Sequence, residues 1–176
     1  MGYGEDWESA WSSLCESFAE GIRVQQREWD CALSTIRDDY SNAYSKIQSE
    51  YAKSLSSIGN DYQKAYRTLK ERREEAKRKK EEAKKEKIAA ERKQDKQKIK
   101  ECELLIVRLD GKEKEADRSL DKLESDTKRY KVRLKEKANT SSKRVADKIN
   151  DNIRSINTKR KQKGLNQYSY ISGSSI

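Results

Sequence analysis

The three cysteines are the side chains of this sequence best suited to covalent chemistry or metal binding. Cys15, Cys31 and Cys102 are widely separated and form no C-x-x-C pair, so a zinc or iron–sulfur site within one chain is not expected. The chain has no histidine, which removes the imidazole general base, the histidine-containing triads and the commonest metal ligand. We therefore predict no catalytic, cofactor-binding or metal-binding residue, no small-molecule substrate and no enzymatic activity.

The cysteine count and the chain's polarity also bear on location. An odd number of widely spaced cysteines argues against a secreted disulfide framework and favours a reducing compartment. No apolar run approaches the roughly 18 residues that a transmembrane helix needs. The segment MGYGEDWESAW is acidic, whereas a targeting sequence would be basic. We expect a cytoplasmic protein without a transmembrane segment, and the cytoskeleton is a candidate location.

The composition restricts the elements that could position any site. Charged residues make up 41% of the 176 residues, hydrophobic residues make up only 32%, and proline is absent. There is too little apolar material for an ordinary compact core at this length. Away from the two ends, the only glycines are Gly21, Gly59 and Gly111, so little opposes a long helix. The composition indicates a fibrous, helical protein.

The strongest pattern in the chain is an eleven-residue repeat in residues 7–69. Its first position is always aromatic: Trp7, Phe18, Trp29, Tyr40, Tyr51 and Tyr62. Four residues later comes a second large apolar residue: Trp11, Ile22, Leu33, Tyr44, Leu55 and Tyr66. Seven residues later the repeat has Leu14, Gln25, Ile36, Ile47, Ile58 and Leu69, and three residues later it has only small residues. These positions form one continuous face of a helix.

Eleven residues over three turns gives about 3.67 residues per turn, which favours a right-handed supercoil. The small residues let backbones approach while the aromatic rings fill the space beside them. The pattern resembles right-handed coiled coils, formed by several chains or by one chain packed against itself. A helix lying on a lipid surface is the alternative, but residues 1–69 carry a net charge of −4, which an anionic membrane would repel.

Residues 70–98 read as a charged helical strut. They contain 14 basic and 8 acidic residues, with several Glu–Lys pairs four residues apart that support an isolated helix. This segment is either a solvated helix without a ligand or a basic surface for an acidic polymer.

Residues 99–163 read as a basic coiled coil. A heptad pattern is expected from Cys102 to Leu134, and eleven-residue spacing returns over 134–156. Asp110-Gly111 is a turn signal that allows a hairpin, but the heptad keeps its register across it and favours a continuous helix. Gly164 is expected to end the helix. The polar tail, residues 164–176, reads as disordered unless a neighbour such as the next subunit orders it.

The expected fold is therefore all-α, with one very long, nearly continuous helix in an elongated coiled coil. The expected segments are an N-terminal cap (1–6), the aromatic eleven-residue repeat (7–69), the charged strut (70–98), the basic coiled coil (99–163) and the tail (164–176). The predicted interface consists of the large residues on the repeating positions: Trp7, Trp11, Leu14, Phe18, Ile22, Trp29, Leu33, Ile36, Tyr40, Tyr44, Ile47, Tyr51, Leu55, Ile58, Tyr62, Tyr66, Leu69, Ile106, Leu109, Leu120, Leu123, Tyr130, Leu134, Val145, Ile149 and Ile156.

The function expected from these features is structural. Residues 1–69 carry −4 and residues 70–176 carry +14, so acidic and basic ends would attract one another. We expect a homo-oligomer that assembles into filaments or bundles through the aromatic face. The alternative is a helical strut that binds an acidic polymer, such as nucleic acid, a ribonucleoprotein or a cytoskeletal lattice, through residues 70–163. A lipid-surface helix is a second alternative. The pattern leaves the oligomer number and helix orientation open.

Overall fold

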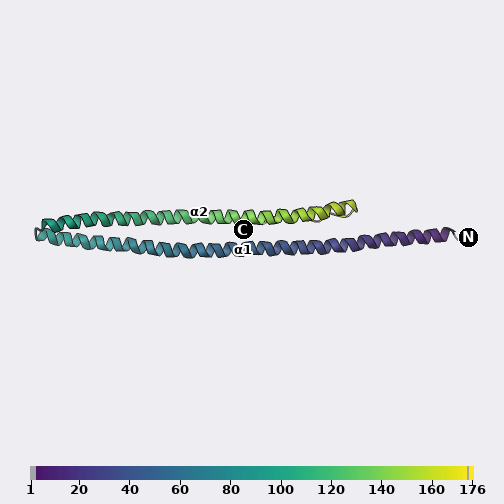
Figure 1. The fold of residues 1–176 in the computed structure, drawn as a ribbon, viewed down its shortest axis with the longest axis horizontal. Helices are drawn as coiled ribbons and strands as arrows, with labels where there is room; N and C mark the ends of the chain where they lie inside the picture. Colours follow the sequence, from purple (N-terminus) through teal and green to yellow (C-terminus); the bar gives the residue numbers. More distant parts are fainter. Residues whose placement is uncertain (1–2, 174) are drawn as a thin grey trace. The chain divides into compact units, whose positions relative to one another are not determined.

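The computed structural model describes the backbone of residues 3–173 and 175–176, and the side chains from Asp6 onward within these ranges. It contains two long helices packed together, α1 (Tyr3–Arg92) and α2 (Lys96–Gln162) (Figure 1). The described residues contain no strand, and none of their helices is long and apolar enough to cross a membrane. The predicted all-α class is confirmed. Of the predicted cap (1–6), residues 1–2 lie outside the described chain.

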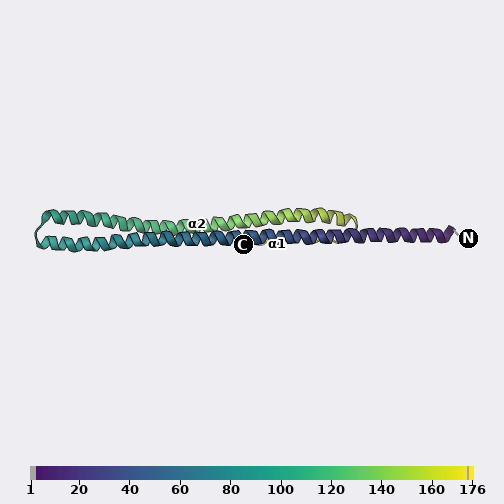
Figure 2. The ribbon, with the colours of Figure 1, turned by 60° about the horizontal axis from the view of Figure 1, so that its bottom comes forward.

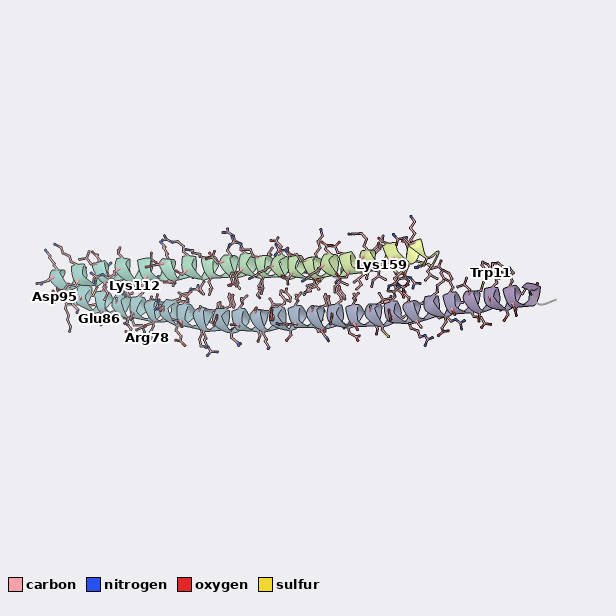
Figure 3. The ribbon with its side chains drawn as sticks, turned by 45° about the vertical axis from the view of Figure 1, so that its right-hand side comes forward. Trp11, Arg78, Glu86, Asp95, Lys112 and Lys159 are labelled. Atoms are coloured by element: carbon pink, nitrogen blue, oxygen red, sulfur yellow. The ribbon has the colours of Figure 1, made fainter. Side chains whose placement is uncertain are left out.

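A tight turn separates the two helices, so the expectation of one nearly continuous helix was wrong. Gln94 has a left-handed backbone with φ of 56°, and its N–H donates to the Glu91 carbonyl at 3.1 Å. The Asp95 N–H donates to the Ala90 carbonyl at 3.0 Å, which completes a helix-ending motif. The break falls inside the predicted charged strut, near the position of Asp95 in Figure 3.

The same turn starts the second helix. The Asp95 carboxylate accepts a hydrogen bond from the Lys98 N–H at 3.1 Å, as an N-cap residue does. The chain thus reverses its direction at Gln94 and Asp95, and neither of these residues is a glycine or a proline. Gly111 instead lies within α2, and the preference for a continuous helix at that position is confirmed.

The second helix ends as the sequence predicts. Gly164 has φ of 70°, a conformation that costs glycine little because it lacks a Cβ. Its N–H donates to the Lys161 carbonyl, and the Leu165 N–H donates to the Arg160 carbonyl, both at 3.0 Å. These bonds satisfy carbonyls that the end of the helix would otherwise leave unpaired.

The chain divides into two compact units. Unit 1 comprises Met1–Ser49 and Lys137–Ile176, and unit 2 comprises Glu50–Glu136 with the turn between the helices. In both units a stretch of α1 lies beside a stretch of α2 and runs in the opposite direction (Figure 2).

Unit 2 has a narrow contact face built from small residues at seven-residue intervals. Ala76, Ala83 and Ala90 are buried along α1. In the same unit, Cys102, Leu109 and Ala116 are buried at seven-residue intervals along α2. Cys102, Leu109 and Ala116 belong to the heptad pattern predicted from the sequence. Small side chains at these positions permit the two backbones to lie close together.

Three basic residues alternate with the alanines of α1 and pair with acidic residues of α2. Arg73 Nε lies 2.8 Å from Asp117 Oδ1, Lys80 Nζ lies 3.1 Å from Asp110 Oδ1, and Lys87 Nζ lies 3.2 Å from Glu103 Oε1. We call these three contacts the charge ladder. Successive contacts are seven residues apart on each helix, so all three pairs form in the same register of the two helices.

The middle contact of the ladder is the best shielded. Lys80 Nζ also donates to Glu113 Oε2 at 2.8 Å, and both of these side chains are largely covered. Hydrogen bonding to Glu113 and then to Asp110 raises the pKa of Lys80. The bond from Lys80 lowers the pKa of Glu113, and the bonds from Lys114 and Lys80 lower the pKa of Asp110. All three groups are therefore held in their charged forms.

Unit 1 has a small hydrophobic core made by both helices and the tail. Leu33 of α1 packs with Ile149 and Ile153 of α2, and Ile153 is fully buried. The partly buried side chains around them are Ile36, Tyr40, Val145, Tyr168 and Ile171. Tyr168 and Ile171 come from the tail, so in unit 1 the tail forms a third layer beside the two helices.

Candidate self-association surface

The tail of unit 1 is held by asparagine side chains of α2. Asn157 donates from Nδ2 to the Tyr168 carbonyl at 3.0 Å and accepts from the Tyr168 N–H at 2.7 Å. Asn150 makes the same pair of bonds with the backbone of Ile171, at 2.8 and 2.7 Å. Asn139 accepts from the Ile176 N–H at 2.7 Å. The tail therefore runs back along α2, and its backbone groups are paired by side chains.

This docking corrects the expectation for the tail. Residues 164–176 were expected to be disordered unless another subunit ordered them. The described tail residues, 164–173 and 175–176, dock on their own chain, because the asparagines replace the hydrogen bonds with water that an extended tail would otherwise need. Tyr168 and Ile171 add apolar contacts with the unit 1 core.

A cation–aromatic cluster lies in unit 1 at the last turn of α2. Arg160 is 5% exposed, and its guanidinium carbon lies 4.0 Å from the centre of the Tyr168 ring and 5.7 Å from that of the Trp29 ring. Arg160 Nε donates to the Asn166 carbonyl at 2.6 Å, and the Tyr168 hydroxyl donates to the Asp30 carboxylate. We call Trp29, Asp30, Arg160 and Tyr168 the end cluster. It joins α1, α2 and the tail at the last turn of α2.

The hydroxyl of Tyr168 stays neutral in this cluster. Burial raises the pKa of Tyr168, and the hydrogen bond to Asp30 raises it further, which outweighs the opposing effect of Arg160. The hydroxyl therefore remains a donor to the Asp30 carboxylate, while it accepts from Arg160 Nη1 at 3.0 Å.

On the N-terminal side of the end cluster, the aromatic face of α1 is uncovered. Trp7 and Phe18 are 69% and 66% exposed, whereas Trp29 is 8% exposed at the next equivalent position. Figure 3 shows Trp11 on the part of α1 that continues past the end of α2, where Lys159 marks the last turn. We call the large exposed side chains on this part of α1 the open face: Trp7, Trp11, Leu14 and Phe18.

The open face continues the pattern that unit 1 has already buried. Trp7 and Phe18 precede Trp29 by two and one repeats of eleven residues, so all three lie on the same stripe of the helix. The Trp7 and Trp11 rings stack with their centres 6.4 Å apart. Three exposed rings of this size present roughly 400 Å² of apolar surface, which is the size of patch that often has a function in a monomer.

The structure covers most of the predicted interface within one chain. Trp29, Leu33, Leu109 and Ile149 are buried, and most of the others are partly buried. The predicted interface residues that remain exposed are Trp7, Trp11, Leu14, Phe18, Tyr66 and Tyr130. Four of these six form the open face, so the exposed remainder of the prediction is concentrated there.

The basic and acidic residues of the charge ladder were not among the predicted site residues. A sequence signal for them exists, because Arg73, Lys80 and Lys87 lie 22, 15 and 8 residues before Asp95. Glu103, Asp110 and Asp117 lie 8, 15 and 22 residues after it. Opposite charges arranged symmetrically about a capping residue indicate an antiparallel hairpin.

The asparagines that hold the tail were also absent from the predicted site. Asn139, Asn150 and Asn157 are ordinary polar residues of a helix in the sequence, and only the returning tail gives them partners. The cysteines are unpaired: Cys15 and Cys31 are exposed, whereas Cys102 is buried. Among the described residues, no group of three or more His, Cys, Asp or Glu side chains is arranged to hold a metal ion.

Comparisons of the chain with family models, with curated proteins and with solved structures give no match.

Proposed function

We propose that this protein is a structural, self-associating helical hairpin whose open face joins copies of the chain. The observation that carries the proposal is the abrupt change in exposure along one stripe of α1, from 69% and 66% at Trp7 and Phe18 to 8% at Trp29. Burying large apolar rings is favourable, and aromatic residues are enriched in protein interfaces.

The structure changes the way in which we expect copies to meet. Within unit 1, residues 1–49 carry nine acidic and four basic residues, while residues 137–176 carry nine basic and two acidic ones. The charge difference that the sequence suggested for contacts between molecules therefore favours packing within the unit. Self-association then depends on surfaces that the chain leaves uncovered, and the open face is an apolar surface of this kind. Filaments or bundles would need a further contact surface besides the open face.

The test is sedimentation velocity of nuclease-treated protein at about 150 mM salt, where exposed charges are screened beyond about 8 Å. The parent should form dimers or larger species that dissociate on dilution. Trp11→Ser with Phe18→Ser should be monomeric and should keep the helical content of the parent, because both side chains are exposed in the single chain.

A matched control separates the open face from exposed apolar surface in general. Leu104→Ser with Val107→Ser changes two equally exposed side chains of unit 2. This variant should associate like the parent. Association of the Trp11 and Phe18 variant at the parental level would show that the open face is not the contact surface.

A second candidate function is binding of single-stranded nucleic acid by residues 128–135 of unit 2. Five of these eight residues are Lys or Arg and none is acidic. Tyr130 and Val132 are exposed between the basic residues. A basic stretch with an exposed aromatic ring can neutralise phosphates and stack a base.

This candidate is tested by fluorescence anisotropy with a labelled single-stranded oligonucleotide at several salt concentrations. Lys131→Gln with Arg133→Gln should weaken binding and flatten its salt dependence. The control is Lys77→Gln with Lys85→Gln, which removes the same charge from a segment where acidic residues are interspersed. Equal weakening by both pairs would show only a general charge effect.

A further inference from the structure

We propose that two copies of the chain join by antiparallel packing of their open faces, with Leu14 of one copy level with Leu14 of the other. This inference rests on the proposed self-association and names its partner and geometry. The partner is a second copy, because the open face continues the stripe of α1 that already packs against an antiparallel helix of the same chain.

The order of large and small residues sets the register of the pair. In an antiparallel pair centred on Leu14, Trp7 of one copy is level with Gly21 of the other, and Phe18 is level with Ala10. Gly21 has open space around it, since a Cβ placed there would meet nothing within 4 Å. Large rings then lie beside small residues, as close helix packing requires.

A parallel pair in the same register would be packed less well. Trp7 would lie beside Trp7 and Phe18 beside Phe18, while Ala10 and Gly21 would face their own equivalents. Such a pair crowds the large rings and leaves gaps between the small residues. The antiparallel pair avoids both effects with the same side chains.

The charges at the edges of the open face favour the same orientation. Asp6 and Glu8 lie on opposite edges of the stripe, at about 98° per residue. A parallel pair would therefore place Asp6 of each copy beside Glu8 of the other. In the antiparallel pair, the edge that carries Glu8 meets the edge that carries Arg23, within about one turn. Arg23 also contacts the Glu20 carboxylate, which it shares with Arg27, at 3.6 and 3.3 Å.

The ends of the two chains also fit in this register. Asp6 of the second copy lies level with Ile22, before α1 reaches the end cluster at Trp29. Tyr3 of the second copy, where α1 begins, lies level with Gln25, which is also before Trp29. Because each copy covers the whole open face of the other, this contact closes as a symmetric dimer.

Disulfide trapping tests the orientation. In a background with the two exposed cysteines replaced (Cys15→Ser and Cys31→Ser), one variant carries Ala10→Cys and the other carries Ser17→Cys. Both positions are exposed and lie on the same edge of the open face. One variant is labelled with ¹⁵N, so that mass spectrometry distinguishes mixed from identical pairs after mild oxidation.

The antiparallel pair predicts disulfides between position 10 of one copy and position 17 of the other, formed only in the mixture. Identical positions would be displaced along the axis by about 12 Å for residue 10 and about 9 Å for residue 17, which is beyond disulfide reach. Efficient cross-linking of the Ala10→Cys variant with itself would place residue 10 of the two copies at the same level, as in a parallel pair, and would overturn the inference.

Sedimentation velocity of the unoxidised variants distinguishes failure of the proposed orientation from failure of self-association itself. If the variants are dimeric but form no mixed disulfide, the register or the orientation is wrong while self-association stands. If the parent chain and both variants remain monomeric at every concentration, the proposed function fails as well. A mixed disulfide that disappears with Trp11→Ser and Phe18→Ser would support both.

Discussion

Removing the Asn157 side chain should release the tail from unit 1. Asn157 is 2% exposed and makes two hydrogen bonds with the backbone of Tyr168, at 3.0 and 2.7 Å. Each such bond contributes about 0.5–1.5 kcal/mol net, so Asn157→Ala should weaken docking of the tail by about 1–3 kcal/mol. The Tyr168 N–H and carbonyl then have no side-chain partner from α2 and must find water.

Hydrogen exchange of the Tyr168 amide measures this loss directly. A change of 1–3 kcal/mol corresponds to exchange that is about 5- to 150-fold faster, if the amide exchanges when the tail opens. Asn150→Ala should have a similar effect on the Ile171 amide, which Asn150 holds at 2.7 Å. The two effects should not be additive, because one tail connects both sites.

The control is Asn152→Ala, which makes the same substitution at an exposed position of α2 in the same segment. It gains the same helix propensity, so the difference between Asn157→Ala and Asn152→Ala isolates the hydrogen bonds. If the Tyr168 amide exchanges at the same rate in both variants, the asparagine does not hold the tail, and the account of unit 1 given above is wrong.

Three further predictions concern unit 2. Gln94→Gly should raise the free energy of unfolding by about 0.5–1 kcal/mol in urea titrations, because glycine adopts the left-handed turn without strain; a loss of stability would contradict the turn. Gly111→Ala should add about 0.5–1 kcal/mol by the same assay, since its Cβ would meet nothing within 4 Å, and a clear loss would indicate an unseen contact. The lowered pKa values of Asp110 and Glu113 stabilise the fold above their ordinary values of 3.8 and 4.5, and this stabilisation is lost as the pH falls through the lowered values. The raised pKa of Lys80 stabilises the fold below 10.5 and ceases to do so above its raised value. Melting curves of Lys80→Gln should accordingly depend less on pH in acid than those of the parent, and parallel acid limbs would refute the ladder's role.

The sequence predicts the helical class well because its patterns depend on residues close together in the chain. The helix end at Gly164 is likewise readable, since glycine tolerates the left-handed conformation there. The continuity of α2 through Gly111 follows from the heptad on either side of it. Each of these predictions needs only the residues of one helix.

The reversal at Gln94 was missed because its signals are weak when each is read alone. Glutamine is a good helix former, and a left-handed glutamine is unusual. The strong signals are the N-cap residue Asp95 and the charges placed symmetrically about it. The symmetry is recognised only when the sequence before Asp95 is compared with the sequence after it. Without the reversal, the sequence left open whether the face from Trp29 onward packs against other chains or against its own chain, whereas α2 and the tail cover most of it.

The tail could not be predicted because its order depends on pairing between distant residues. Tyr168 and Ile171 meet Asn157 and Asn150 only after the chain turns at Gly164 and runs back along α2. A polar tail with two or three apolar residues has no periodicity of its own. Its contribution is visible only in the packed unit, where Tyr168 and Ile171 join the core.

Because the charge ladder repeats every seven residues, the paired helices of unit 2 can be shortened or lengthened in steps of seven residues. Removal of residues 74–80 from α1 together with 110–116 from α2 leaves Arg73 opposite Asp117 and Lys87 opposite Glu103. The paired helices then lose one heptad, about 10.5 Å of helix, and their remaining contacts are unchanged. Removal of residues 74–80 from α1 alone would bring Arg73 opposite Asp110, and Asp117 would lose its partner in the ladder. The length of the paired helices in unit 2 can therefore change in steps of one heptad. Matched insertions or deletions in α1 and α2 achieve this without a new interface.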